Sequence, residues 1–148
     1  SLSFYSFETS VASHKILKVV EAFLEVIEYL TKNKIMSLSS TAEAIKHYKE
    51  TFNWENGFES WSKVPTTEKY HMVAPNLGLE ATGADEIKDI IFGFCTDNEL
   101  EQELVDIVEH GQYVTCMLHL KTKSGESLQC VEVFLLDEEG RVDKIWAL

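Results

Sequence analysis

Three side chains in the second half of the sequence are of types that transfer protons, namely His71, His119 and Glu132. Glu132 stands between Val131 and Val133 in an apolar run that predicts a strand. If Glu132 faces the interior, its carboxyl group can act as a base when ionised or donate a hydrogen bond to an oxyanion when neutral. The period of two places Glu132 opposite Val131 and Val133, and this pattern alone favours the competing interpretation, a solvent-facing side chain.

His119 lies in the preceding segment, 113–121, in which apolar residues alternate. A two-residue turn at Ser124-Gly125 would pair His119 with Cys130 and place it diagonal to Glu132, about 7 Å away. A His–Glu pair at that distance can pass a proton. A three-residue loop would instead turn His119 to the other face of the sheet, where it would be an interface or surface residue.

Aromatic and long apolar side chains form a candidate ligand-binding set. Its members are Phe23, Trp54, Phe58, Trp61, Tyr70, Met117 and Trp146. The two tryptophans of segment 52–61 could also form a lid. Core filling is the alternative role for the aromatic residues, because each buries a large area.

The spacing of His, Cys, Asp and Glu predicts no metal site, and no Gly-rich loop joins a strand to a helix. We therefore expect neither a metal nor a cofactor. The three cysteines, Cys95, Cys116 and Cys130, show no pairing pattern. A sparse, odd number of cysteines is typical of reduced thiols, which predicts a cytoplasmic protein.

Charge further restricts the expected partners. The chain of 148 residues has a formal net charge of −12, and such a surface repels nucleic acid and anionic membranes. No apolar run reaches the roughly 18 residues that a membrane span requires. We expect a small apolar molecule as the ligand, with no nucleic-acid or membrane partner.

Apolar periodicity predicts helices first and strands later. Helical spacing predicts a long, well-buried helix over His14–Lys34, a second helix from Ser40 to Phe52, and a third that begins at Gly83. A period of two predicts the later strands, and the full set of expected strands is Tyr70–Ala74, Leu104–Glu109, Tyr113–Lys121, Leu128–Leu136 and Arg141–Ala147.

These elements predict a single α+β domain over residues 1–148. Three N-terminal helices would pack on a curved antiparallel sheet and form a cone with an internal pocket. Both faces of the last strands carry apolar residues, and the domain's own helices can cover only one of them. We therefore expect a homodimer formed through the sheet.

The order of elements, together with two short motifs, resembles the nuclear transport factor 2-like superfamily. Gly83-Ala84-Asp85-Glu86-Ile87 is similar to its Gly-x-x-x-Ile helix start, and the segment 137–142 is similar to its acidic-Gly-basic turn. The resemblance spans nearly the whole chain. It implies the cone-shaped fold of ketosteroid isomerase and polyketide cyclases, with a pocket for a small, largely apolar ligand.

The resemblance also implies roles for single residues. The general base of ketosteroid isomerase falls on Ala74, which cannot take a proton, and its oxyanion-hole Tyr falls on Phe23. The partner acid of that site falls on Glu132. His71, beside Tyr70 in a strand that borders the pockets of the superfamily, is the best replacement for the missing base, with an edge-strand His as the alternative. The Arg-x-Asp strand motif of limonene epoxide hydrolase is missing from 114–121.

Overall fold

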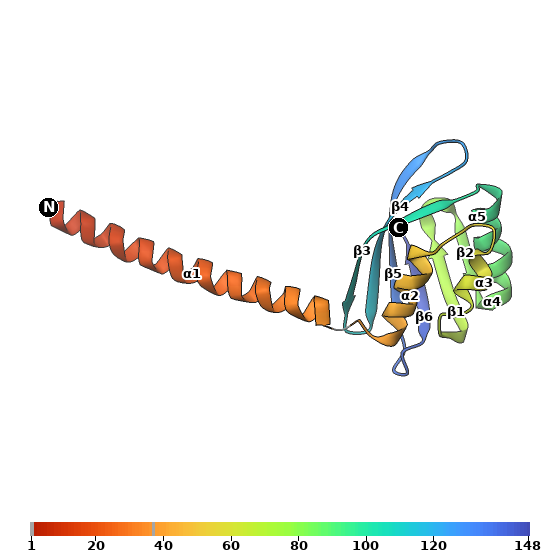
Figure 1. Ribbon diagram of the computed structural model, residues 1–148, viewed down its shortest axis with the longest axis horizontal. Helices are drawn as coiled ribbons and strands as arrows, with labels where there is room; N and C mark the ends of the chain where they lie inside the picture. The colour runs from red at the N-terminus through yellow and green to blue at the C-terminus, as the bar shows by residue number, and fades with distance from the viewer. Residues whose placement is uncertain (1, 37) are drawn as a thin grey trace. The chain divides into compact units, whose positions relative to one another are not determined.

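The computed structural model describes residues 2–36 and 38–148, which divide into two compact units. The first is helix α1 (Leu2–Met36). The second holds all remaining elements (Figure 1). In chain order these are α2 (Ser40–Glu50), α3 (Gly57–Trp61), β1 (Thr66–Ala74), η1 (Pro75–Leu77), β2 (Leu79–Thr82), α4 (Gly83–Glu86), η2 (Ile87–Phe92), α5 (Gly93–Asp97), β3 (Glu101–His110), β4 (Tyr113–Lys121), β5 (Ser127–Leu136) and β6 (Val142–Ala147).

Helix α1 contains the predicted helix 14–34, but the predicted burial of that helix is wrong. Ile16 is 64% exposed and Phe23 is 65% exposed. An amphipathic pattern shows that a helix has an apolar side, but it does not identify what covers that side. Within the described residues, no helix is long and apolar enough to cross a membrane.

Residues 38–148 form an α+β unit built on one curved sheet of six strands. The strand order is β2-β1-β6-β5-β4-β3. Four of the five pairings are antiparallel, but β1 and β6 run parallel, so that the sheet is mixed. The register shifts between Leu104 and Asp106 in β3 and between Leu135 and Leu136 in β5. Such bulges bend a strand and help the sheet to curve.

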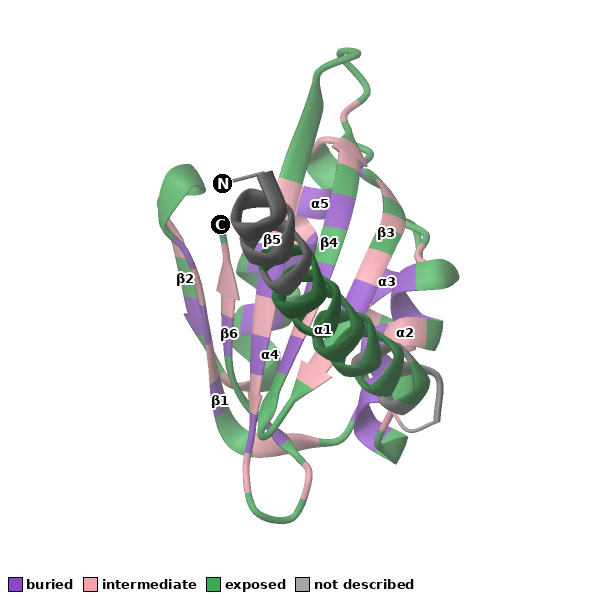
Figure 2. Cartoon of the chain, turned by 90° about the vertical axis from the view of Figure 1, so that its left-hand side faces the viewer, coloured by how far each residue is buried: buried purple, intermediate pink, exposed green. Residues whose placement is uncertain are grey.

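Alternation along the strands gives the sheet two different faces, which is visible as alternating bands of burial in Figure 2. The inner face carries fully buried side chains such as Val114, Leu118 and Phe134. The short helices α2, α3 and the continuous segment α4–η2–α5 lie beside the sheet (Figure 1), and their buried side chains share one core with this face.

Helix α2 begins at a capped position and packs with its apolar side inward. The Ser39 hydroxyl group accepts a hydrogen bond from the Ala42 amide, which satisfies one free N–H group of the first turn. The Ser39 amide donates to the Glu109 carboxylate at 2.7 Å, linking the helix start to β3. The helix begins at Ser40, as predicted, and ends at Glu50, two residues before the predicted end. Ile45 and Tyr48 are buried, as the helical spacing predicts.

Candidate functional site: a cavity on the inner face of the sheet

A cavity lies between the inner face of the sheet and the helices of unit 38–148. Water-sized molecules have about 80 Å³ in which their centres can move, which is room for several waters. The wall is mostly apolar. It consists of Tyr48, Lys49, Trp61, Met72, Ala74, Leu77, Leu79, Ile87, Ile91, Phe92, Phe94, Cys95, Leu100, Gln102, Leu120, Cys130, Glu132, Phe134, Ile145 and Ala147.

An ion pair forms the polar part of this wall. Lys49 Nζ of α2 lies 2.6 Å from Glu132 Oε2 of β5, and the two side chains are only 3% and 10% exposed. Lys49 Nζ also donates to Gln102 Oε1 of β3 at 3.2 Å. The ammonium group lies 5.1 Å from the centre of the Tyr48 ring and 5.9 Å from that of Phe134. Three elements thus meet at one buried cation.

A buried ion pair is not the most stabilising way to fill a core. Removing two charges from water costs several kcal/mol for each ion, and their attraction often does no more than offset that cost. Apolar residues of similar volume commonly serve stability as well or better. A charged pair on the wall of an apolar cavity is therefore a candidate for function, since it supplies both a proton acceptor and a hydrogen-bond donor.

Aromatic side chains that contact one another form the part of the wall next to the ion pair. Trp61 Nε1 donates a hydrogen bond to Tyr70 Oη at 2.8 Å, and both residues are buried. The Trp61 ring lies 5.2 Å from the Tyr48 ring and 6.1 Å from the Phe134 ring, between centres. Burial, reinforced by the negative charge of Glu132, raises the pKa of Tyr48. Burial also raises the pKa of Tyr70. Both phenols remain protonated at neutral pH.

A π-helical segment, η2, forms the helical side of the cavity. It contributes Ile87, Ile91 and Phe92 to the wall. Single π-helical turns inside α-helices occur often at functional sites. Gly57 lets α3 approach this segment, because a Cβ atom there would lie 3.0 Å from both Phe52 and Phe92.

Three cysteine thiols lie near the ion pair, and their reactivity at neutral pH is low. Burial, the largest cause, raises the pKa of Cys95 to about 11, that of Cys116 to about 12 and that of Cys130 to about 11. Lys49 opposes these increases and Glu132 adds to them. A thiol with such a pKa is almost fully protonated at neutral pH and is a poor nucleophile.

The structure brings only some of the predicted residues to the cavity. Glu132 and Trp61 line it, and Tyr70 contacts Trp61 through its hydroxyl group. Glu132 therefore faces the interior, as the superfamily resemblance implied and as its strand pattern alone did not. Its neighbour across the sheet is Cys116 on the inner face of β4.

Both predicted histidines lie on the outer face of the sheet. His119 pairs with Gln129, so the predicted pairing with Cys130 is wrong. The loop between β4 and β5 spans residues 122–126, and its length sets this register. His119 is exposed and hydrogen-bonds Ser127 Oγ at 2.9 Å. His71 Nε2 lies 2.7 Å from Glu80 Oε1. Neither histidine shares a face with Glu132.

The other predicted ligand-binding residues also lie elsewhere. Met117 and Trp146 are on the outer face, where Lys144 Nζ lies 5.8 Å from the centre of the Trp146 ring. Trp54 and Phe58 border a separate open depression, formed by residues 54–59, 88, 89, 92, 93, 96 and 97. Phe23 belongs to the other unit, helix α1, where its side chain is 65% exposed.

Sequence reasoning missed Lys49, Tyr48 and Gln102 as site residues. Lys49 follows Ile45 by four positions on a short helix, so its side chain lies on the buried side of that helix. A lysine on the apolar side of one element and a glutamate in a buried strand are the signal that could have indicated a buried ion pair. Among the described residues, no cluster of three or more His, Cys, Asp or Glu side chains could hold a metal ion.

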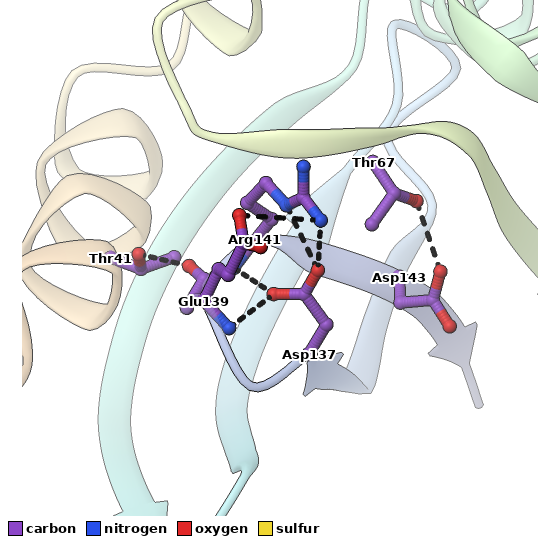
Figure 3. A network of polar contacts seen from close by, with 7 residues as sticks. Thr41, Thr67, Asp137, Glu139, Arg141 and Asp143 are labelled. Atoms are coloured by element: carbon purple, nitrogen blue, oxygen red, sulfur yellow. Dashed lines mark hydrogen bonds and ion pairs between the residues drawn. The ribbon is translucent and has the colours of Figure 1, made fainter.

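The turn between β5 and β6 follows the motif that suggested the superfamily (Figure 3). Asp137 Oδ1 accepts hydrogen bonds from the amides of Glu139 and Arg141, and the Arg141 guanidinium group contacts Asp137 Oδ2 at 2.8 Å. The backbone bond from Arg141 is the largest cause that lowers the pKa of Asp137. Gly140 has a φ of 78°, which glycine adopts without strain. Its carbonyl group accepts from Thr41 Oγ1 of α2.

Comparisons with known proteins show the fold. No protein-family model matches the chain, and no curated protein sequence matches it. An NTF2-like protein of unknown function from Burkholderia pseudomallei superposes with a TM-score of 0.60 at 16% identity, over 75% of this chain and 91% of that one. The chain has the nuclear transport factor 2-like fold. At this identity the likeness extends to the fold alone.

Two further structures share the nuclear transport factor 2-like fold. A putative polyketide cyclase from Sinorhizobium meliloti has a TM-score of 0.60 at 11% identity, over 76% of this chain and 97% of that one. TerC, co-crystallised with polyporic acid, has a TM-score of 0.61 at 17% identity, over 74% and 91%. The share of this chain that is covered, about three quarters, equals the share formed by unit 38–148.

Proposed function

We propose that unit 38–148 binds a small, largely apolar molecule with an oxygen function in its inner cavity, and that the Lys49–Glu132 pair transfers a proton on it. The observation that carries this proposal is the buried pair at 2.6 Å on the wall of an apolar cavity. Support also comes from TerC, a protein of this fold that was co-crystallised with polyporic acid.

The geometry suits proton transfer next to a carbonyl group. The Lys49 ammonium group can donate a hydrogen bond to the substrate oxygen while the Glu132 carboxylate removes a proton from the adjacent carbon. The negative charge that develops on the oxygen then lies beside a fixed cation in surroundings with little water, where such stabilisation is strong. Returning the proton at another carbon gives isomerisation. If the neighbouring carbon carries a hydroxyl group, that group takes the proton from Glu132 and leaves as water while the carbon–carbon double bond forms, which is dehydration.

A second candidate is a ligand carrier without catalysis. Its supporting observation is that Lys49 already holds the Glu132 carboxylate, so that a ligand must compete for it. In this case the cavity binds the apolar molecule, the ion pair contributes only orientation, and no proton moves.

The outer face of the sheet carries the second part of the proposal, a homodimer. An outer-face patch gathers apolar side chains that are half-buried or exposed in a single chain: Val108, Tyr113, Met117, Val131, Val133, Leu135 and Trp146. A contiguous apolar patch rimmed by polar residues is typical of an interface. A second copy of the same face would cover it around a two-fold axis.

The ligand proposal is tested with small cyclic ketones in a thermal-unfolding screen. A compound that binds only the folded chain, at 100 times its dissociation constant, adds about 2.7 kcal/mol to the free energy of unfolding. Bound ketones are then incubated in heavy water, and mass spectrometry measures exchange of the hydrogens next to the carbonyl group. We expect exchange with the wild type, its loss with Glu132→Gln, and its retention with the outer-face control His119→Gln.

The outcomes separate the two candidates. Binding without exchange in the wild type contradicts catalysis and leaves the carrier. Ala147→Leu narrows the cavity and should therefore weaken binding. If it does not, the compound binds elsewhere, and both the catalytic and the carrier candidates are contradicted. Absence of any stabilising ketone contradicts the proposed substrate class.

A further inference from the structure

Helix α1 presents an apolar side that is exposed along about three turns. Eight residues form this side, each between 43% and 69% exposed: Ile16, Leu17, Val19, Val20, Phe23, Leu24, Val26 and Ile27. At 100° per residue they lie within about half of the helix circumference. Four of them, at 16, 20, 23 and 27, follow the 4-3-4 spacing of a coiled-coil seam. An exposed apolar stripe of this length indicates an interaction surface.

The order of residues along this stripe is nearly symmetric about the midpoint between Glu21 and Ala22. Reversal of the segment 14–29 about that point exchanges apolar positions with apolar positions. The exchanged apolar pairs are 16 with 27, 17 with 26, 19 with 24, and 20 with 23. Two copies packed antiparallel around a two-fold axis at this midpoint would therefore match apolar residues at every level.

Charges on the polar side of the same segment favour the same orientation. Lys15 and Lys18 precede the midpoint, and Glu25 and Glu28 follow it. Reversal exchanges Lys15 with Glu28 and Lys18 with Glu25, so that antiparallel copies place opposite charges at the same level. Parallel copies would place like charges at each of these levels. Because the four side chains lie on the sides of the helices that face away from the seam, this charge effect is screened by salt and adds little to the apolar match.

We propose that α1 is a self-association helix, which pairs antiparallel with α1 of a second copy of this chain about the midpoint between Glu21 and Ala22. Eight partly exposed apolar side chains correspond to on the order of 500 Å² for each helix, so the pair buries roughly 1,000 Å² in total. That area is at the low end for a specific interface, and the association is concentration-dependent.

A membrane surface is the competing occupant of an amphipathic helix. Helices that bind anionic membranes carry Lys and Arg along the polar side. Here the polar side carries three glutamates, Glu21, Glu25 and Glu28, against the two lysines named above, and the whole chain has a net charge of −12. Both features oppose binding to anionic lipid, whereas the reversal symmetry is explained by a second copy.

Sedimentation of the full chain between 1 and 200 μM tests whether the apolar side of α1 mediates self-association. Phe23→Asp places a charge in the seam, and Ala22→Asp places the same charge at the adjacent position outside it. We expect Phe23→Asp to weaken association at least tenfold and Ala22→Asp to change it less than threefold. Equal behaviour of both variants and the wild type overturns the proposal, as does binding of the wild type to phosphatidylserine vesicles in place of self-association.

Cysteine cross-linking tests the orientation and separates this interface from the proposed sheet dimer. Ile16→Cys combined with Ile27→Cys should give a covalent dimer under mild oxidation, since the two positions meet in the antiparallel pair. Ile16→Cys alone should not, because its two copies are eleven residues apart along the axis, about 16 Å. Cross-linking by Ile16→Cys alone would show a parallel pair and overturn the proposal. The wild type, with its three natural cysteines, is the control.

Discussion

Lys49 and Glu132 meet on the inner face of the sheet, whereas His71 and Glu80 meet on its outer side at almost the same distance, 2.6 Å against 2.7 Å. The inner side chains are 3% and 10% exposed, and the outer ones are 28% and 68% exposed. Water screens the outer pair, and exposed pairs contribute from 0 to about 1 kcal/mol. The inner pair is buried from bulk water, so each charge depends on the other for its stabilisation. Burial, not distance, determines how strongly the stability of the chain depends on each of these two contacts.

The same contrast holds for the chemistry of the two faces. The inner face surrounds a cavity with one charged pair, protonated phenols and protonated thiols. The outer face offers two histidines and an apolar patch. This difference is the reason why we propose the inner face as the site of a small molecule and the outer face as the site of a second copy of the chain.

Removal of the inner cation gives the largest effect that we expect. Lys49→Met leaves Glu132 buried without a counter-charge, and breaking a buried pair from one side costs about 3–5 kcal/mol of the free energy of unfolding. Urea unfolding measures this loss. On the outer side Glu80→Gln should change the same quantity by about 0.5 kcal/mol or less.

The double variant Lys49→Met with Glu132→Leu completes this test. Removal of both charges should recover most of the stability, because no unpaired charge remains in the core. If Lys49→Met and Glu80→Gln lower the free energy of unfolding by the same amount, the inner and outer ion pairs are equivalent. The contrast between the two faces of the sheet is then wrong.

The next largest effect is the loss of stability at alkaline pH, which also arises from a residue of the inner face. The pKa of Cys116 is raised by burial from 9.0 to about 12. Below pH 9 the thiol is protonated in the folded and the unfolded chain, and its contribution to stability is fully present. As pH rises above 9 the unfolded thiol ionises first, so stability falls by up to about 1.4 kcal/mol per pH unit until the folded pKa is reached.

Urea unfolding at pH 8, 9 and 9.5 measures this slope while most tyrosines of the unfolded chain, with a pKa of about 10, are still protonated. Cys116→Ala lowers stability at every pH because it removes buried atoms, but it should make the decline above pH 9 shallower. An unchanged slope in Cys116→Ala would show that this thiol is not the group that titrates.

The sequence predicted five of the six strands and missed the short strand β2, and the pairing that it predicted between β4 and β5 was wrong. The alternation of Val114, Cys116 and Leu118 predicted β4 with the bounds that the structure has. The face of His119 depended on the loop that follows, and the structure has a five-residue loop, 122–126, instead of a two-residue turn. Since side chains alternate with a period of two, an error of one residue in register moves every side chain to the other face.

The site was predictable only where one residue carried the signal. Glu132 was noticed because an acid inside an apolar strand is unusual. Its partner Lys49 lies 83 positions earlier in a helix, and no local pattern joins the two. Helix α1 was predicted as a helix, but its pattern did not reveal that residues 38–148 form a core of their own. Local periodicity determines which side of an element is apolar, and tertiary packing determines what that side meets.

The smallest expected effect on stability comes from the outer-face patch, where a change should act on association instead. Met117 is 48% exposed, so Met117→Lys should alter the free energy of unfolding of the single chain by about 0.5 kcal/mol or less. In the proposed sheet dimer, however, Met117→Lys buries an unpaired charge on each side of the two-fold axis.

His119→Lys is the control, because it adds the same charge to the same face, near the hairpin end and outside the patch. Sedimentation of chains that also carry Phe23→Asp, so that α1 does not contribute, should show dimers weakened by Met117→Lys and retained with His119→Lys. If Phe23→Asp chains are monomers at 200 μM, the outer face does not form a dimer, and its apolar residues belong to a different contact.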